Sequence, residues 1–326
     1  MRTVRLGSSD LEVTPIAYGT WQFGGDWGAV DEEAAIAAIR RAHELGVNFF
    51  DTARAYGFGI SERILGRALT EQLGGAEREQ IVIATKGGLR IDAEEGLVRD
   101  SSPQWLHRAL DESLVDLGLD YVDLFQLHWP DTHTPFTETG EALREMVDAG
   151  KVRHVGVSNF SAEQMEELGQ TIRVETLQPP YHLFRREIER EVLPYALEHD
   201  IGVLVYGPLA HGLLGGAMDA GTTFPDDDWR SNSDVFHGEA FERNLEVVRD
   251  LQELAEERGA TVSRLAIAWT LAHPAVQVSI VGARRLDHLE ESVGAADLQL
   301  SQEDLERIEE IMAGATQVAG PSPEGV

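Results

Sequence analysis

The chain has 326 residues, of which 42% are hydrophobic, and its 57 acidic against 27 basic side chains give a formal net charge of −30. Such a charge repels nucleic acid and anionic membrane surfaces, and no apolar run reaches the roughly 18 residues that a membrane-spanning helix needs. The absence of cysteine excludes disulfides, thiol nucleophiles and zinc–thiolate sites. Since no apolar stretch of signal-peptide length follows the N-terminus, the sequence predicts a soluble, cytoplasmic protein.

The excess of acidic side chains has two explanations. At molar salt the Debye length shrinks to about 3 Å, which would make the self-repulsion tolerable and favours adaptation to a salt-rich cytoplasm, with an acidic surface on a halophilic protein. A GC-rich genome would explain why Lys86 and Lys151 are the only lysines, but not the carboxylates. A lysine that persists in such a chain is a candidate for a functional role.

Strand and helix patterns alternate along the chain. Two short segments at 2–5 and 11–15 surround a Gly-Ser-Ser-Asp turn, which predicts a hairpin that caps one end of the domain. A strand at 16–19 leads to a helix at 32–45, with Asp31 as its N-cap and Gly46 as its stop. Seven further strands are expected at 47–50, 81–85, 121–127, 152–157, 174–178, 202–206 and 277–281, followed by helices at 61–73, 103–117, 137–149, 162–169, 187–198, 239–258 and 285–295. Eight strand-plus-helix units predict the α/β fold of a (β/α)8 TIM barrel.

The remaining segments fit around this barrel. Two extra helices are expected on its wall, at 261–272 and 302–313. The loop at 207–238 exceeds the usual connection length, and we expect a lid there in preference to a disordered segment. The tail at 313–326 is expected to be coil. No domain boundary is apparent, so residues 1–326 are predicted to form a single domain.

Four ionisable residues lie at the ends of successive predicted strands. Asp51 follows the second strand, Tyr56 lies just beyond it, Lys86 follows the third and His128 follows the fourth. In a barrel these strand ends surround one spot. An ordinary tyrosine, with a pKa near 10, is a poor proton donor at neutral pH, but a neighbouring ammonium lowers that pKa and a carboxylate can orient the ammonium. The set could protonate a developing alkoxide while the histidine donates a hydrogen bond to the same oxygen. Each residue alone has an ordinary structural explanation, but all of these explanations would have to hold at once.

Several motifs in register carry a family resemblance. They are Asp51-Thr-Ala-Xaa-Xaa-Tyr-Gly, Thr85-Lys-Gly, Leu127-His-Trp-Pro, the segment 150–159 and Gln178-Pro-Pro-Tyr. In this order and at this spacing they resemble the aldo-keto reductases, over roughly residues 2–312. Three further segments, 58–62, 205–209 and 280–284, are most similar to the bacterial branch that includes general stress protein 69.

The resemblance implies an oxidoreductase that reduces an aldehyde or ketone by hydride transfer from NADPH, with NAD(H) left open. It implies that Tyr56 is the general acid, that Lys86 and Asp51 tune it, and that His128 orients the carbonyl. The cofactor would lie across the barrel mouth under the loop 207–238. Its implied contacts are Gly19, Thr20, Trp21, Asp51, Ser158, Asn159, Gln178, Tyr206, Gly207, Pro208, Leu209, Gly212, Leu214, Gly282, Ala283, Arg284, His288, Glu291 and Ser292.

Within this implied cofactor site, the residue types suit different parts of the cofactor. Ser158, Asn159 and Gln178 would hold the carboxamide and Tyr206 would stack on the nicotinamide ring, while the glycines of 207–214 can bring backbone N–H groups against a pyrophosphate. Arg284 stands at a helix N-terminus, where it suits the 2′-phosphate of NADP. Family members often carry Gln or Arg at the position of His288 and Asn at that of Ser292, so preference for NADP over NAD stays open.

Other features leave the substrate and the partners open. Trp21, Phe58 and Trp129 would wall the pocket for an apolar or sugar-like carbonyl, although the same side chains would be ordinary core residues. His128 and His133 lack metal-ligand spacing, so no metal is expected. The expected partner is a small carbonyl compound and the default state is a monomer. A second class stays open, a regulatory or redox-sensor subunit on this fold that binds NADPH and turns over little.

Overall fold

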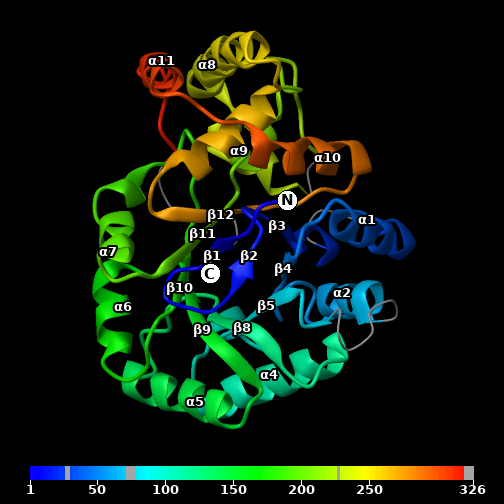
Figure 1. Ribbon diagram of the computed structural model, residues 1–326, viewed down its shortest axis with the longest axis vertical. Helices are drawn as coiled ribbons and strands as arrows, with labels where there is room; N and C mark the ends of the chain where they lie inside the picture. Colours follow the sequence, from blue (N-terminus) through cyan, green and yellow to red (C-terminus); the bar gives the residue numbers. More distant parts are fainter. Residues whose placement is uncertain (26–29, 71–77, 226–227, 319–326) are drawn as a thin grey trace.

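Eight parallel strands close into a barrel at the centre of the molecule (Figure 1). The computed structural model describes residues 1–25, 30–70, 78–225 and 228–318. The barrel strands are β3 (Ile16–Gly19), β4 (Phe49–Asp51), β5 (Val82–Gly87), β8 (Val122–Leu127), β9 (Val152–Ser158), β10 (Thr176–Gln178), β11 (Gly202–Tyr206) and β12 (Val276–Val281). Each pairs with the next barrel strand along the chain, and β12 closes the ring on β3. The predicted (β/α)8 TIM barrel is therefore confirmed.

Two strands run further than the sequence pattern indicates. Asp51 is the last residue of β4, and Lys86 lies inside β5 instead of following it. Both are held in the sheet by their neighbours, since Asp51 pairs with Ala84 of β5 and Lys86 pairs with Gln126 of β8. The backbone of both residues is therefore fixed by the hydrogen bonds of the sheet.

A ring of helices surrounds the strands (Figure 1). The helices that follow barrel strands are α1 (Glu32–Glu44), α2 (Ile60–Thr70), α4 (Pro103–Leu117), α5 (Phe136–Asp148), α6 (Ala162–Gly169), α7 (Val192–Glu198), α8 (Gly238–Glu257) and α10 (Leu286–Gly294). The two extra helices are α9 (Val262–Ala272) and α11 (Gln302–Met312). Asp31 caps α1 by accepting from the Ala34 N–H, and Ser301 forms a capping box at α11. Residues 71–73, the end of one predicted helix, lie outside the described residues.

The helix predicted at 187–198 is wrong in its first half. Residues Glu187–Glu189 form a separate 3₁₀ turn, η2, and the α-helix starts only at Val192. A proline inside a helix lacks the N–H for the ladder and clashes with the preceding turn, but it is tolerated in the first turn. Starting at Val192 places Pro194 in that first turn.

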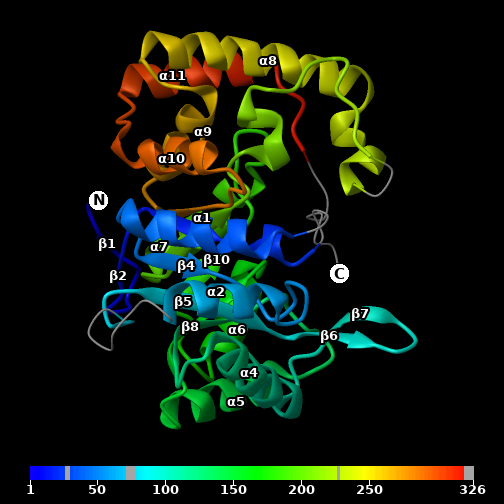
Figure 2. The ribbon, with the colours of Figure 1, turned by 90° about the vertical axis from the view of Figure 1, so that its right-hand side faces the viewer.

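Two apolar clusters form the core, one on each side of the barrel wall. The inner cluster joins barrel side chains such as Phe49 and Leu124 to Leu6 and Leu11 of the N-terminal hairpin. That hairpin, β1 (Val4–Arg5) and β2 (Glu12–Val13), closes the end of the barrel at which the strands begin (Figure 2). The outer cluster fills the space between strands and helices.

A second hairpin, β6 (Leu89–Asp92) and β7 (Gly96–Arg99), projects from the opposite end (Figure 2). The sequence pattern does not reveal it, because its strands are short and their apolar side chains are exposed, with Ile91 at 64% and Leu97 at 43%. Local chemistry makes its turn, since the Asp92 carboxylate accepts from two backbone N–H groups and Gly96 has a φ of +78°.

The long connection after β11 contains three short 3₁₀ segments, η3 (Ala210–Gly215), η4 (Trp229–Asn232) and η5 (Asp234–Phe236). In the expected coil tail, residues 313–318 contain no helix or strand, and the Val318 N–H donates to the Phe184 carbonyl at 2.7 Å, whereas residues 319–326 lie outside the described part.

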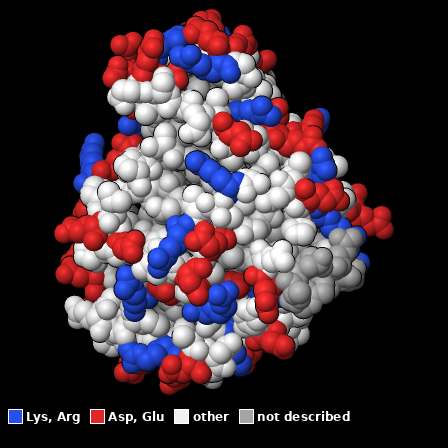
Figure 3. Space-filling model, in the orientation of Figure 1, with Lys and Arg blue, Asp and Glu red and all other residues white. Residues whose placement is uncertain are grey.

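The outer surface bears charges of both signs. On the face that carries the N-terminal hairpin, acidic side chains gather along the edges, and acidic and basic side chains lie side by side below the centre (Figure 3). Within the described ranges no helix is both long and apolar enough to cross a membrane. Adaptation to high salt stays a prediction.

Candidate active site

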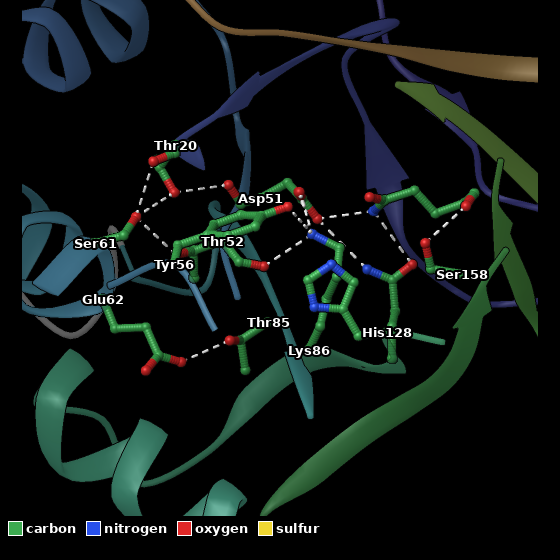
Figure 4. Close-up of polar contacts among 12 residues, drawn as sticks. Thr20, Asp51, Thr52, Tyr56, Ser61, Glu62, Thr85, Lys86, His128 and Ser158 are labelled. Atoms are coloured by element: carbon green, nitrogen blue, oxygen red, sulfur yellow. Dashed lines mark hydrogen bonds and ion pairs between the residues drawn. The ribbon is translucent and has the colours of Figure 1, made fainter. Parts of the chain in front are cut away.

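The structure brings Asp51, Tyr56, Lys86 and His128 together at the carboxyl ends of β4, β5 and β8 (Figure 4). Asp51 and Lys86 come from the strands themselves, His128 directly follows β8, and Tyr56 lies in the turn that leads to α2. All four are buried, with exposed fractions between 1% and 6%. Charges and dipoles in such a site are poorly screened by water, so their mutual effects are strong.

The ammonium group of Lys86 holds the site together. Its Nζ donates to Asp51 Oδ1 at 2.6 Å, to the Thr52 carbonyl at 3.0 Å and to the Tyr56 hydroxyl oxygen at 3.2 Å. An ammonium has three donors, and these three acceptors use all of them. The phenol oxygen therefore lies beside a fully desolvated cation, which stabilises negative charge that develops on it.

Two aromatic rings flank Tyr56. The His128 ring meets it edge to face, with centroids 5.6 Å apart and planes at 81°, and the Trp21 ring lies 6.4 Å away. The backbone of His128 is fixed because its N–H donates to the Gly87 carbonyl at 2.9 Å and its own carbonyl accepts from Asn159 Nδ2 at 3.1 Å. The imidazole and the phenol thus face the same space.

Ser61, at the start of α2, supports this arrangement from behind. Its Oγ lies 2.7 Å from Thr20 Oγ1 and 3.1 Å from Thr52 Oγ1, and all three residues are fully buried. Thr20 Oγ1 in turn donates to the Asp51 carbonyl at 3.0 Å. This chain of hydroxyls ties the backbone on both sides of Asp51 to the helix (Figure 4).

Glu62 is the next residue of α2 and contacts the strand that carries Lys86. It accepts from the Thr85 hydroxyl at 2.6 Å and pairs with Arg54 at 3.3 Å. Burial raises the pKa of Glu62, against the opposing effects of Thr85 and Arg54. Sequence reasoning did not single out Glu62, although its position in the motif that follows Tyr56 is a usable signal.

Ser158, Asn159 and Gln178 lie at the adjacent ends of β9 and β10. Ser158 Oγ donates to the Gln178 carbonyl at 2.8 Å, and Asn159 Nδ2 lies 3.1 Å from Ser158 Oγ. Tyr206, the last residue of β11, donates from its hydroxyl to Asn159 Oδ1 at 2.9 Å. The predicted carboxamide-binding residues therefore form one hydrogen-bonded group.

A cavity of about 320 Å³ opens above these residues. Thirteen of the predicted site residues line it, namely Gly19, Thr20, Trp21, Asp51, Tyr56, Gln178, Tyr206, Gly207, Pro208, Leu209, Gly212, Gly282 and Arg284. It extends from the catalytic group across the mouth to the segment after β12, and an extended ligand can reach both.

The lining of this cavity fits a dinucleotide. Gly207 and Gly212 have φ values of +67° and +100°, and the two residues Ala210 and His211 between them also have positive φ. Left-handed backbone at non-glycine residues is strained and concentrates at ligand sites. Here the left-handed backbone lies in the lining of the cavity. Elsewhere in the lining, Gly19 has no room for a side chain, because a Cβ there would lie 2.8 Å from Ile280 Cγ2. Residues 207–212 can therefore cradle a pyrophosphate.

Five lining residues were missed from the sequence: Gln22, His211, Arg230, Ile280 and Val281. Arg230 is paired with Asp228 and donates to the His211 carbonyl at 3.2 Å. It is the only lysine or arginine between 207 and 238, and this was an available signal. The Gln22 carbonyl accepts from Arg284 at 3.3 Å, so two guanidinium groups border the cavity.

Other predicted residues do not line this cavity. Leu214 and Ala283 are buried, Glu291 pairs with Arg264 at 3.2 Å, and Ser292 Oγ donates to the His288 carbonyl one turn back in α10. Among the residues proposed for the substrate wall, Trp129 is stacked under the Arg99 guanidinium, 4.9 Å from the ring centroid. Phe58 has a φ of +46° between two left-handed glycines.

Comparisons with known proteins agree with this geometry. The model of the Aldo/keto reductase family matches residues 15–313. The chain is 40% identical to the aldo-keto reductase YhdN of Bacillus subtilis over 96% of its own length and 94% of that protein. It is 32% identical to the NADH-specific methylglyoxal reductase of Escherichia coli, over 93% and 96%. The structure of a glycerol dehydrogenase from Gluconobacter oxydans superposes with a TM-score of 0.89 at 37% identity, over 98% of each chain.

Proposed function

Because the chain belongs to the aldo/keto reductase family, whose members act on carbonyl compounds with NADP(H) or NAD(H), we propose that it reduces a small aldehyde or ketone with NADPH and that Tyr56 supplies the proton. The observation that carries the proposal is the contact of Lys86 Nζ with both Asp51 and the Tyr56 hydroxyl inside a buried pocket. A protein that only binds the cofactor has no use for this ion pair, which costs desolvation, so the contact favours an enzyme over a sensor subunit.

Each catalytic side chain has a separate role. When bound, the reduced nicotinamide supplies the hydride for the carbonyl carbon. Tyr56 gives its hydroxyl proton to the carbonyl oxygen, and the Lys86 ammonium stabilises the negative charge left on the phenol oxygen. Asp51 neutralises and orients the ammonium through its 2.6 Å contact. His128, edge-on to Tyr56, orients the carbonyl oxygen by a hydrogen bond.

The residues around the cavity would hold the cofactor along its length. Gln178, with Ser158 and Asn159 behind it, receives the carboxamide, and the ring of Tyr206 supports the nicotinamide. Backbone N–H groups of residues 207–212 and Arg230 suit the pyrophosphate.

Preference for NADPH over NADH is supported by Arg284, a guanidinium that borders the cavity next to the start of α10 and suits a 2′-phosphate. His288, Glu291 and Ser292, on α10, would complete the adenosine end. Replacing Arg284 by leucine should weaken NADPH binding and leave NADH binding nearly unchanged, as measured by cofactor fluorescence. Equal losses for both cofactors would contradict the assignment.

The proposed substrate is a small apolar or sugar-like carbonyl compound next to Trp21, with Phe58 and Trp129 as further wall residues. Similarity to a glycerol dehydrogenase and to a methylglyoxal reductase supports the inclusion of glyceraldehyde, dihydroxyacetone and methylglyoxal among the compounds to be tested. The assignments to one domain, to a lid at 207–238, to a monomer in the cytoplasm and to the branch of general stress protein 69 stay predictions.

The decisive experiment mixes the protein with NADPH and these carbonyl compounds at high salt and follows the loss of NADPH absorbance. Tyr56→Phe should abolish turnover and leave NADPH binding at the parent level, because it removes only the proton. Turnover by this variant at the parent rate would refute the mechanism. Tight NADPH binding by the parent protein without any turnover would identify a sensor instead.

A further inference from the structure

The carboxylate of Asp51 is the hub of a buried group that extends beyond the four catalytic residues. One oxygen, Oδ1, accepts from Lys86, and the other, Oδ2, accepts from Gln178 Nε2 at 2.9 Å and from Gln126 Nε2 at 3.4 Å. Gln178 Nε2 also donates to Gln126 Oε1 at 3.4 Å. Figure 4 shows the Asp51 carboxylate beside the Lys86 ammonium at the centre of this group.

The chemistry of Asp51 sets the orientation of both amides. An ionised carboxylate can only accept hydrogen bonds, so Gln126 and Gln178 must each turn their NH2 group toward it. Once Gln126 is turned in this way, its carbonyl oxygen is free to accept the second N–H of Gln178. Both N–H groups of Gln178 are therefore used inside the protein.

Beyond these contacts, the side chain of Gln126 makes no hydrogen bond in the part of the chain that the structure describes. It is fully buried on β8, and its side chain bonds only to Asp51 and Gln178. The chain makes room for it, since a Cβ at the neighbouring Gly156 would lie 3.1 Å from Gln126 Cγ. A buried amide costs free energy unless it is hydrogen-bonded, so its contacts to these two residues account for its presence.

We propose that Gln126 is a positioning residue that makes Gln178 an acceptor toward the cofactor, so that the site selects the NH2 group of the carboxamide. The inference rests on the proposed function, in which Gln178 holds that group. Gln178 lines the cavity, and with both N–H groups committed it presents only its Oε1 to a ligand.

The neighbouring side chains reinforce this selection. Asn159 Nδ2 donates to the backbone carbonyl of His128 and to Ser158 Oγ, each at 3.1 Å. Ser158 Oγ itself donates to the backbone carbonyl of Gln178, not to its side chain. The side-chain donors of Ser158 and Asn159 are thus hydrogen-bonded to other protein groups. Without Gln126, the second N–H of Gln178 loses its acceptor and becomes available to a carbonyl oxygen of the ligand.

The test compares the binding of NADP⁺ with that of its 3-acetylpyridine analogue, in which a methyl ketone replaces the carboxamide and no NH2 remains. Dissociation constants are measured by calorimetry for the parent protein, Gln126→Leu and the control Thr176→Val. One hydrogen bond corresponds to about a 2- to 12-fold preference of the parent protein for NADP⁺. In Gln126→Leu this ratio should fall toward 1, because Gln178 can now donate to the ketone.

Thr176→Val is a matched control. Thr176 is fully buried beside the same Gly156, and its hydroxyl has no hydrogen-bond partner within the described ranges. It should keep the parent ratio. A purely structural effect of Gln126→Leu would weaken both ligands by the same factor and leave the ratio unchanged, and that result would overturn the inference.

One further variant keeps the inference testable. Gln126→Met has a flexible side chain of similar length and replaces Gln126→Leu where the latter does not fold. Gln126→Met also removes the acceptor for Gln178 and should lower the ratio, so a parent-like ratio in this variant would also overturn the inference. A parent protein that binds no NADP⁺ would overturn the proposed function together with the inference, whereas normal binding of NADP⁺ with unchanged ratios in all variants would overturn the inference alone.

Discussion

The buried ion pair of Lys86 and Asp51 should cost more stability when one partner is removed than when both are replaced. The side chains are 0% and 3% exposed, and their charged atoms are 2.6 Å apart. Lys86→Met leaves the Asp51 carboxylate without its cation, and Asp51→Asn leaves the ammonium with neutral acceptors and no counter-charge. Removing one partner of a buried pair typically costs about 3–5 kcal/mol of unfolding free energy.

Proton exchange sets an upper limit to that cost. A stranded group can become neutral, which at pH 7 costs an ordinary lysine about 4.6 kcal/mol and an ordinary aspartate about 4.2 kcal/mol. Each single variant should therefore lose about 3–4 kcal/mol, below these limits. The double variant Lys86→Met/Asp51→Asn buries no charge and keeps an amide that can accept from Gln178, so it should lose only about 0–2 kcal/mol.

The assay is urea denaturation of the four proteins at pH 7 and constant high salt, without cofactor, with the unfolding free energy taken from the linear extrapolation. The double variant should be more stable than either single variant, although neither it nor the singles should turn over substrate. Additive losses in the double variant would refute the reasoning, because they would mean that the two charges do not depend on each other.

Three further outcomes are expected. A Cβ at Gly24 would lie 2.9 Å from the backbone of Tyr56, so Gly24→Ala should displace the proposed general acid. We expect kcat to fall by about 100-fold and the unfolding free energy by only about 1–3 kcal/mol. An unchanged kcat in steady-state assays would contradict this expectation. Burial lowers the pKa of His154, but the hydrogen bonds and charges of Glu175 and Asp10 outweigh it, so the pKa lies above its ordinary value of 6.5. The resulting stabilisation is present below pH 6.5 and is lost as the pH rises through the higher native pKa. In denaturation curves, His154→Gln should therefore lower the unfolding free energy more at pH 6 than at pH 9. An equal loss at both pH values would exclude the charge effect. Finally, with a net charge of −30 the melting temperature should rise between about 0.1 M and 2 M NaCl, and a flat response in calorimetry would argue against adaptation to salt.

Local patterns of sequence were sufficient for the barrel and for the catalytic group. Strands such as β11 are short apolar runs, and helices such as α1 show the capping side chain at Asp31, so their type depends on neighbours in the chain. The catalytic side chains follow because each lies at the carboxyl end of its own strand, and barrel closure brings those ends together.

The errors arose where contacts between distant residues decide the local structure. The 3₁₀ turn before α7 follows Arg186, whose guanidinium pairs with Glu309 of the distant helix α11 at 2.8 Å. The hairpin of β6 and β7 has too little apolar patterning to be recognised, since Ile91 and Leu97, which pair across its two strands, are both exposed.

The sequence alone predicted which four ionisable residues lie together at the proposed catalytic centre, because their residue types and their places at or just beyond strand ends are local properties. Only the tertiary structure decided which other side chains share that centre. Gln22 meets Gly282 across the seam where β12 closes on β3, Arg230 reaches the cavity from far along a loop, and Gln126 meets Gln178 inside the barrel. These contacts depend on how the barrel closes and on how side chains pack in its interior. Neither can be predicted from a single segment of the chain.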